Sequence, residues 1–186
     1  MNEVIKTILE RRSVRKYEDK PVSREDLELI VKCGQYAATG MGVQPWHFTV
    51  VTDRAVLTKL SDANAAIMLA DPNTPPPVLE MVKSGQFDTY RGAPCAVLVS
   101  GADSKQNTIA DCANATENMA IAAKALGLDS CYLASFQVCL NAPTGGPLKA
   151  ELGIPEGYIP NFALAIGYGA EKPEAAPRKE GAVNWV

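Results

Sequence analysis

The sequence predicts an α/β or α+β fold, in which helices flank one mixed β-sheet. Segments whose apolar residues recur at helical spacing alternate along the chain with short apolar, β-branched runs that are typical of strands. Such interleaving favours layers of helices around a single sheet. The 186 residues, of which 47% are hydrophobic and 21% charged, have a globular composition and suit one domain over residues 1–186.

The N-terminal half contains three expected helices and one expected strand. Ser23 followed by Asp26 resembles a capping box that opens the second helix, and Gly34 could end it. A cluster of prolines later interrupts the pattern and predicts a loop or hinge. The expected elements are a helix over about 2–12, a helix from about 23 to 34, a strand over 46–51, a helix over about 54–68, and the proline-rich loop over 70–80.

The C-terminal half is organised around an alanine-rich helix over residues 111–126. Its small side chains predict that other backbones approach it closely on several sides, and Gly127 lies where a left-handed glycine would end it. The unbroken apolar run CAVLVS at 95–100 is typical of a strand covered on both faces. Further expected elements are a strand near 131–134, a Gly/Pro loop over 141–147, a short helix to Leu152, a strand over 162–168 and a polar tail over 171–186.

Charge and composition exclude several classes of protein. Eighteen lysines and arginines against 21 aspartates and glutamates give a net charge of −3, which argues against general nucleic-acid binding. No apolar run is long enough to span a membrane, and the charged N-terminus lacks a signal peptide's features, so we expect a cytoplasmic protein. Five cysteines without C-x-x-C spacing predict reduced, mostly buried thiols. His47 is the only histidine, so neither a metal site nor a histidine-based triad is expected.

Three segments could bind a flat anionic ligand. The run Arg11-Arg12-Ser13-Val14-Arg15 offers forked hydrogen-bond donors to phosphate or carbonyl oxygens. The same run is also typical of a solvated, basic helix end that complements the helix dipole. In the segment TGMGVQPW, at 39–46, two glycines allow the backbone to approach a flat ligand closely, and the side-chain amide of Gln44 can both donate and accept hydrogen bonds. Arg178 and Lys179 add charge in the tail, and the glycine-rich dinucleotide and P-loop signatures are both missing.

Together these segments resemble the FMN-dependent nitroreductase family. RRSVRKY, QPWHF, GAPCAVLVSG, DCANATENMAIAAKALGLDSCYL and FALAIGYGAEKPEAAPRK follow one another in the family's order and span essentially the whole chain. Gly42 departs from the family's usual asparagine, and Ala134-Ser135 replaces a frequent glycine-containing pair, so contacts at the flavin edge can differ. The resemblance implies roles for these residues. The FMN phosphate and the pyrimidine edge of the flavin are expected to be held by Arg11, Arg12, Ser13 and Arg15, and Arg178 is expected to join the phosphate site. The loop with Gln44 is expected to lie along the ring system, and the backbone of Ala134 and Ser135 is expected to face flavin N5.

The resemblance also implies an activity and an assembly. We expect an FMN oxidoreductase that takes electrons from NADH or NADPH and passes them, in a ping-pong sequence, to a nitroaromatic, a quinone or a similar flat acceptor. The cofactor performs the redox chemistry, so no catalytic acid or base is assigned. Family members form homodimers with exchanged tails, and the apolar residues among 183–186 are expected to dock on the partner. A flavin-storage module, or a dehydrogenase of a peptide or small heterocycle, remains the alternative. Met41, Phe87 and Tyr90 are candidates for the pocket wall or for the core.

Overall fold

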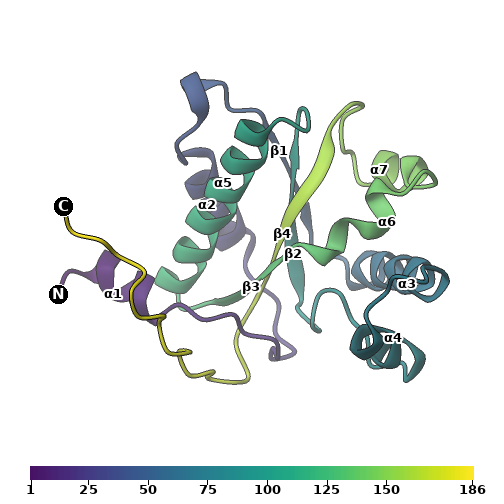
Figure 1. The fold of residues 1–186 in the computed structure, drawn as a ribbon, viewed down its shortest axis with the longest axis horizontal. Helices are drawn as coiled ribbons and strands as arrows, with labels where there is room; N and C mark the ends of the chain where they lie inside the picture. Colours follow the sequence, from purple (N-terminus) through teal and green to yellow (C-terminus); the bar gives the residue numbers. More distant parts are fainter.

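A computed structural model describes residues 1–186 and shows helices on both faces of a four-stranded sheet (Figure 1). The strands are β1 (Trp46–Val51), β2 (Cys95–Gly101), β3 (Asp129–Leu133) and β4 (Ile159–Gly167). They lie in the order β1-β2-β4-β3 and pair antiparallel throughout. The parallel component expected of a mixed sheet is limited to an isolated bridge between Ser13 and Ser130. The predicted α+β class is confirmed.

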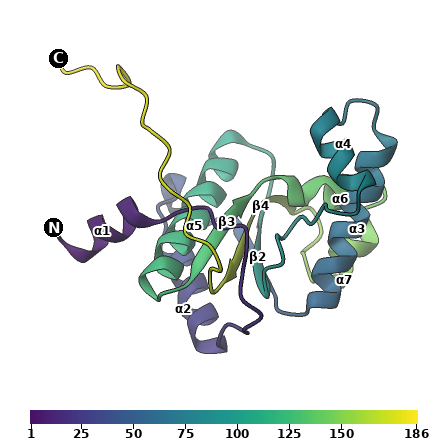
Figure 2. The ribbon, with the colours of Figure 1, turned by 90° about the horizontal axis from the view of Figure 1, so that it is seen from below.

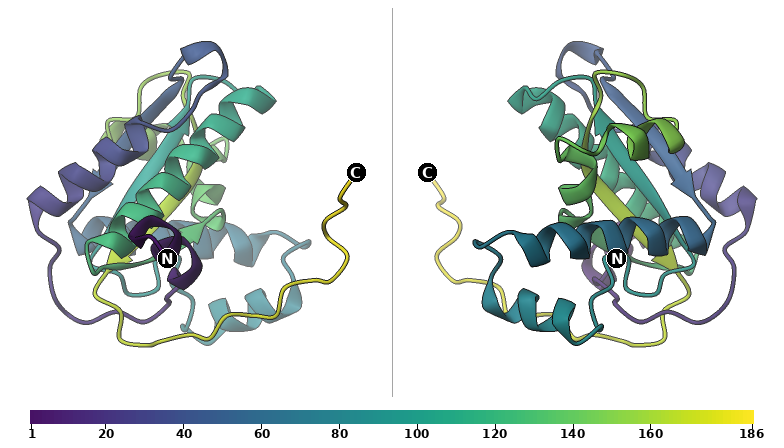
Figure 3. Two further views of the ribbon diagram at one scale, coloured as in Figure 1. Left: turned by 90° about the vertical axis from the view of Figure 1, so that its left-hand side faces the viewer. Right: turned by 90° about the vertical axis from the view of Figure 1, so that its right-hand side faces the viewer.

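Two layers of helices cover the sheet, one on each face (Figures 1 and 3). α2 and α5 pack on one face, whereas α3 and α6 pack on the other and α4 packs against α3. The helices are α1 (Glu3–Glu10), α2 (Arg24–Gln35), α3 (Arg54–Ala70), α4 (Pro76–Lys83), α5 (Gln106–Ala125), α6 (Val138–Asn141) and α7 (Gly146–Glu151), with short 3-10 turns at Gly40–Gly42 and Ser135–Gln137.

The buried strand β2 divides the interior into two cores. Every residue of β2 is buried, and successive side chains point to opposite faces of the sheet. Val97 and Val99 join the core beneath α2 and α5, while Ala96 and Leu98 join the core beneath α3 and α6. This placement explains why the run at 95–100 is apolar without alternation.

Gly34 does not end α2, contrary to the expectation from sequence. The helix continues to Gln35, and Gly34 is buried at its contact with α5. A Cβ atom at this position would lie 2.8 Å from Cγ of Met119, closer than real Cβ contacts allow. The glycine therefore permits close packing of two helices, and the small side chains of α5 serve the same contact.

Two other boundaries differ from the predicted ones. The proline-rich segment was expected to be a loop, but α4 begins inside it at Pro76, since proline is tolerated in the first turn of a helix. α5 begins at Gln106, five residues before the predicted Asp111, because its polar first turn carries no alanine pattern. Gly127 does follow α5 with a φ of +76°, as expected.

The two ends of the chain leave apolar side chains uncovered. α1 lies beside α5, and the tail beyond β4 runs away from the body of the molecule (Figure 2). No helix is both long enough and apolar enough to span a bilayer. The exposed large apolar side chains at the two ends are Met1, then Val4, Ile5, Ile8 and Leu9 of α1, and Val183, Trp185 and Val186 of the tail.

Candidate functional site

A hollow of about 480 Å³ lies between the end of α1 and the C-terminal tail. The structure brings four of the residues singled out from the sequence to this hollow, namely Arg11, Arg12, Ser13 and Arg178. Ile8, Leu9, Ala175 and Ala176 complete its wall, and no carboxylate lines it. Three guanidinium groups and a hydroxyl without a lining acid form a donor set suited to a phosphate.

The segment that follows α1 is fixed against the edge of the sheet. The N–H of Val14 donates to the carbonyl of Ser130 (3.0 Å), which places Ser13 beside β3. Val14 itself is buried, with 1% of its surface exposed. Arg12 holds the end of the helix, because its Nη1 donates to the carbonyl oxygens of Leu9 (2.7 Å) and Arg11 (2.8 Å). The basic motif therefore has a defined position rather than the freedom of a solvated helix end.

Arg11 offers a buried donor without an acceptor. Its Nε lies 3.2 Å from Oε1 of Glu117 on α5, but the N–H is not aligned with that oxygen and makes no hydrogen bond. The side chain is only 26% exposed. A buried N–H without a hydrogen-bond acceptor is unfavourable, so this group fits a ligand that supplies an oxygen, even though Glu117 balances the charge of Arg11.

Arg15 lies where the first and last motifs of the chain meet. Its backbone N–H donates to Oε1 of Glu171 (2.6 Å), and its Nη1 donates to the carbonyl of Ser13 (3.2 Å). Nearby, the hydroxyl of Tyr17 donates to the carbonyl of Val14 (2.7 Å), and burial raises the pKa of this phenol. The side chain of Arg15 is exposed and stands next to β3 rather than in the hollow that Arg178 lines.

Ala134 and Ser135 follow the end of β3 and are exposed, whereas the next residue, Phe136, is fully buried and anchors the turn. The distance along β3 from Ser130 to Ala134 is four residues, or about 13 Å at roughly 3.3 Å per residue. A ligand that touches both the basic hollow and this turn must therefore be elongated and lie along β3.

Gln44 is not brought to the arginines within one chain. It precedes the end of β1 that pairs with Gly101, whereas Ser13 bridges Ser130 at the opposite edge and the opposite end of the sheet. Gln44 is exposed and lines a separate hollow between α2 and β1. Its φ of +51° and the φ of +54° at Met41 lie in the left-handed region, which is rare for residues with side chains and often marks functional loops.

The three candidates for a pocket wall have different surroundings. Met41 is fully exposed in a single chain, and Phe87 is half-buried. Tyr90 belongs to the core beneath α3 and α6 and is 1% exposed, so it is a core residue. Of the two roles considered for these residues, Tyr90 therefore has the role in the core.

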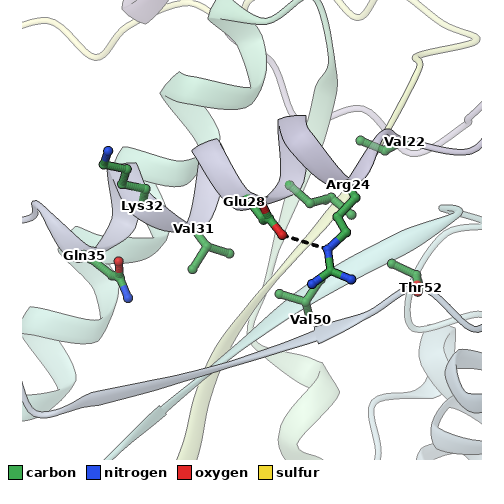
Figure 4. Close-up of a pocket in the computed structure, with 9 residues that line it drawn as sticks. Val22, Arg24, Glu28, Val31, Lys32, Gln35, Val50 and Thr52 are labelled. Carbon is green, nitrogen blue, oxygen red and sulfur yellow. Dashed lines mark hydrogen bonds and ion pairs between the residues drawn. The ribbon is translucent and has the colours of Figure 1, made fainter.

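A larger groove, of about 560 Å³, lies between α2 and the outer edge of β1 (Figure 4). Val22, Val31 and Val50 form its apolar wall, and Arg24 pairs with Glu28 at 2.7 Å across its rim (Figure 4). Sequence reasoning missed this groove. The feature that marks the groove in the structure is Val50, an apolar residue that is 43% exposed on an edge strand.

Other reactive side chains are placed in structural positions. His47 is half-buried in β1, and its ring meets the ring of Tyr158 edge-on at a centroid distance of 5.9 Å. Four of the five cysteines are buried, as predicted, and burial raises the pKa of Cys95 to about 12 and that of Cys112 to about 11. No three histidine, cysteine, aspartate or glutamate side chains are grouped so that they could hold a metal ion.

Comparisons with known proteins identify the family and the fold. The profile of the Nitroreductase family matches residues 8–168. The chain is 30% identical over 191 residues to an FMN reductase (NADPH) of Bacillus subtilis, covering 96% of this chain and 70% of that protein. It is 32% identical over 185 residues to an Archaeoglobus fulgidus protein provisionally named an NADH dehydrogenase/NAD(P)H nitroreductase, covering 94% and 90% of the two chains. A nitroreductase of Bacteroides fragilis, solved with bound FMN, superimposes over 100% of both chains with a TM-score of 0.92 at 31% identity.

Proposed function

The chain belongs to the nitroreductase family, and we propose that it is an FMN oxidoreductase that uses NADH or NADPH as its electron donor. The observation that carries this proposal is the convergence of Arg11, Arg12, Ser13 and Arg178 on one hollow that no carboxylate lines. The donor set fits the terminal phosphate of FMN. The family match covers most of the chain, which supports one functional domain over residues 1–186.

Each element of the site has a proposed role. Arg11, Ser13 and Arg178 bind the phosphate, and Arg15 lies at the pyrimidine edge of the flavin. Arg12 adds positive charge while it holds the end of α1, since two carbonyl oxygens already occupy its Nη1. Because β3 runs from Ser130 to the exposed turn after Leu133, we place the ring system along this strand. The backbone of Ala134 and Ser135 then faces flavin N5.

A homodimer would complete this site. Gln44 cannot reach the arginines of its own chain, so we propose that the loop over 39–44 of a second copy covers the ring system. The exposed apolar side chains of α1 and of the tail support such an assembly, since large uncovered apolar surfaces mark interfaces. The groove of Figure 4 and the unpaired edge of β1 offer the tail of the partner a place to dock, because an extended segment can add to an open sheet edge.

The chain supplies binding and orientation rather than acid–base groups. When bound, FMN would supply the redox chemistry that connects the nicotinamide donor with the acceptor. The donor and the acceptor use the same open face of the site in turn, which predicts ping-pong kinetics. The match to the Nitroreductase family supports nitroaromatics, quinones and similar flat molecules as the acceptors. The cytoplasmic location remains a prediction from the sequence.

Steady-state kinetics test this function. We expect purified protein loaded with FMN to oxidise NADH or NADPH when a quinone or nitroaromatic is present, with parallel double-reciprocal plots. A flavin-storage module would bind FMN tightly but would show no turnover with any donor. A dehydrogenase of a peptide or heterocycle would reduce its flavin with such a substrate and leave the nicotinamides unreacted. Either result would contradict the proposed activity while keeping FMN binding.

A further inference from the structure

A guanidinium in the turn before β2 has no role in the fold or in the phosphate site. Arg91 follows the buried Tyr90 and is itself half-buried. Its Nε is enclosed and has no hydrogen-bond partner. Buried polar groups without a partner are rare in native proteins, so the acceptor for this donor is expected outside the single chain.

The backbone holds Arg91 in an unfavourable conformation. Its φ is +61°, in the left-handed region that side-chain-bearing residues avoid. The carboxylate of Asp88 fixes the turn on both sides, since Oδ1 accepts from the N–H of Tyr90 (2.8 Å) and Oδ2 accepts from the N–H of Gly92 (2.6 Å). The buried ring of Tyr90 anchors the turn to the core. Strain that is imposed in this way is characteristic of functional positions.

Arg91 lies close to the residues that we assign to FMN. Arg91 precedes Cys95, the first residue of β2, by four residues; Cys95 pairs with Ile166 of β4, and Ile166 pairs with Ser130 of β3, which bridges Ser13. The turn with Arg91 therefore lies at the same end of the sheet as the basic motif. Burial raises the pKa of the Cys131 thiol on β3, and the charges of Arg15, Arg91 and Arg11 oppose this rise, in agreement with that placement. Cys131 lies between Ser130, beside the basic motif, and Ala134, at the end of β3. Arg91 and the basic motif that contains Arg11 and Arg15 therefore lie at one end of the strand on which we place the flavin.

Arg91 forms no ion pair within the chain, and the carboxylates of its own turn and of the basic motif have other partners. Glu117 pairs with Arg11, Asp88 accepts from two backbone N–H groups, and Glu171 accepts from the backbone N–H of Arg15. Neither Arg91 nor Arg15 lines the hollow shared by Arg11 and Arg178. The unused guanidinium of Arg91 is therefore not part of the hollow that we assign to the phosphate.

We propose that Arg91 is a second guanidinium at the pyrimidine edge of the flavin, where it acts with Arg15 on the N1–O2 side. The proposal rests on the proposed FMN site. Reduction of flavin adds negative charge at this edge, and a fixed cation in a partly buried site stabilises that charge more strongly than the neutral oxidised ring. Arg91 therefore raises the midpoint potential of bound FMN and makes its reduction by a nicotinamide more favourable.

Redox titration of FMN-loaded variants tests the proposal. We expect Arg91→Met and Arg91→Gln to weaken binding of reduced FMN about tenfold more than binding of oxidised FMN, which for a two-electron couple lowers the midpoint potential by about 30 mV. Arg91→Lys keeps the charge and should recover most of this shift. Arg54→Met is the matched control, because Arg54 is 51% exposed and pairs with Asp19 on the surface. The midpoint potential of FMN bound to the Arg54→Met variant should equal that of FMN bound to the wild type.

Other outcomes would overturn the assignment. An unchanged potential in both Arg91→Met and Arg91→Gln, with wild-type protein that binds FMN, would reject the role of Arg91 and leave the proposed function intact. A variant that loses dimer stability at an unchanged potential would show that Arg91 pairs across an interface instead. Wild-type protein that takes up no FMN would reject the proposed function itself, along with this inference.

Discussion

Arg178 offers the cleanest test of the phosphate site. Its side chain is exposed, and its Nε and Nη2 donate only to the carbonyl of Ala176, at 3.1 and 2.6 Å, so Arg178→Met removes a ligand contact without disturbing the core. A hydrogen bond to a charged group contributes about 1.5–3 kcal/mol, and its loss should weaken FMN binding about ten- to a hundredfold.

The assay compares two ligands that differ only in the phosphate. Apoprotein is titrated with FMN and with riboflavin while flavin fluorescence is followed. Arg178→Met should raise the Kd for FMN by the amount given above and leave the Kd for riboflavin almost unchanged. Lys179→Met, at the neighbouring exposed position, is the control and should affect both ligands little. An equal loss of affinity for FMN and riboflavin would refute the assignment of Arg178 to the phosphate.

Three further predictions concern assembly, packing and thiol reactivity. Removal of residues 182–186 should lower dimer stability and flavin content together, as measured by light scattering and flavin absorbance; a truncated protein that stays dimeric and fully flavinated would contradict the tail's role. Gly34→Ala should destabilise the fold by about 1–3 kcal/mol in denaturant titrations, because the added methyl group meets Met119, and an unchanged midpoint would show that α2 and α5 can separate freely. Burial raises the pKa of Cys95 to about 12, so at pH 8 a thiol reagent should modify Cys33, which is partly exposed, well before Cys95. Rapid modification of Cys95 in the native protein would contradict its burial.

The pattern of apolar residues was sufficient to predict most elements of the fold. β1 was predicted with its observed bounds, since aromatic and β-branched residues at 46–51 are bounded by Pro45 and Asp53. Gly34 was misinterpreted because a glycine near the end of a helical pattern is usually taken as a C-cap. Here the glycine instead allows α2 to pack closely against Met119 of α5, which lies 85 positions later in the sequence. Local sequence cannot reveal such a contact.

The arrangement of the candidate site was predictable to the extent that it is local in sequence. Arg11, Arg12 and Ser13 are neighbours, and the bridge to Ser130 fixes them where the tail brings Arg178. The position of Gln44 could not be predicted in the same way, because its relation to the arginines depends on tertiary and, in our proposal, quaternary structure. Arg91 gave no sequence signal, since neither its left-handed φ nor its unpartnered Nε is visible in the residue order.

Identification of the bound flavin tests the central claim most directly. The protein is purified from an overexpressing host, its cofactor is released by heat, and the supernatant is analysed by chromatography against FMN, FAD and riboflavin standards. We predict a yellow protein that releases FMN at about one equivalent per chain, since each chain has the hollow lined by Arg11, Arg12 and Arg178 that we assign to the terminal phosphate. A colourless protein that fails to take up added FMN, or one that releases FAD, would contradict the account.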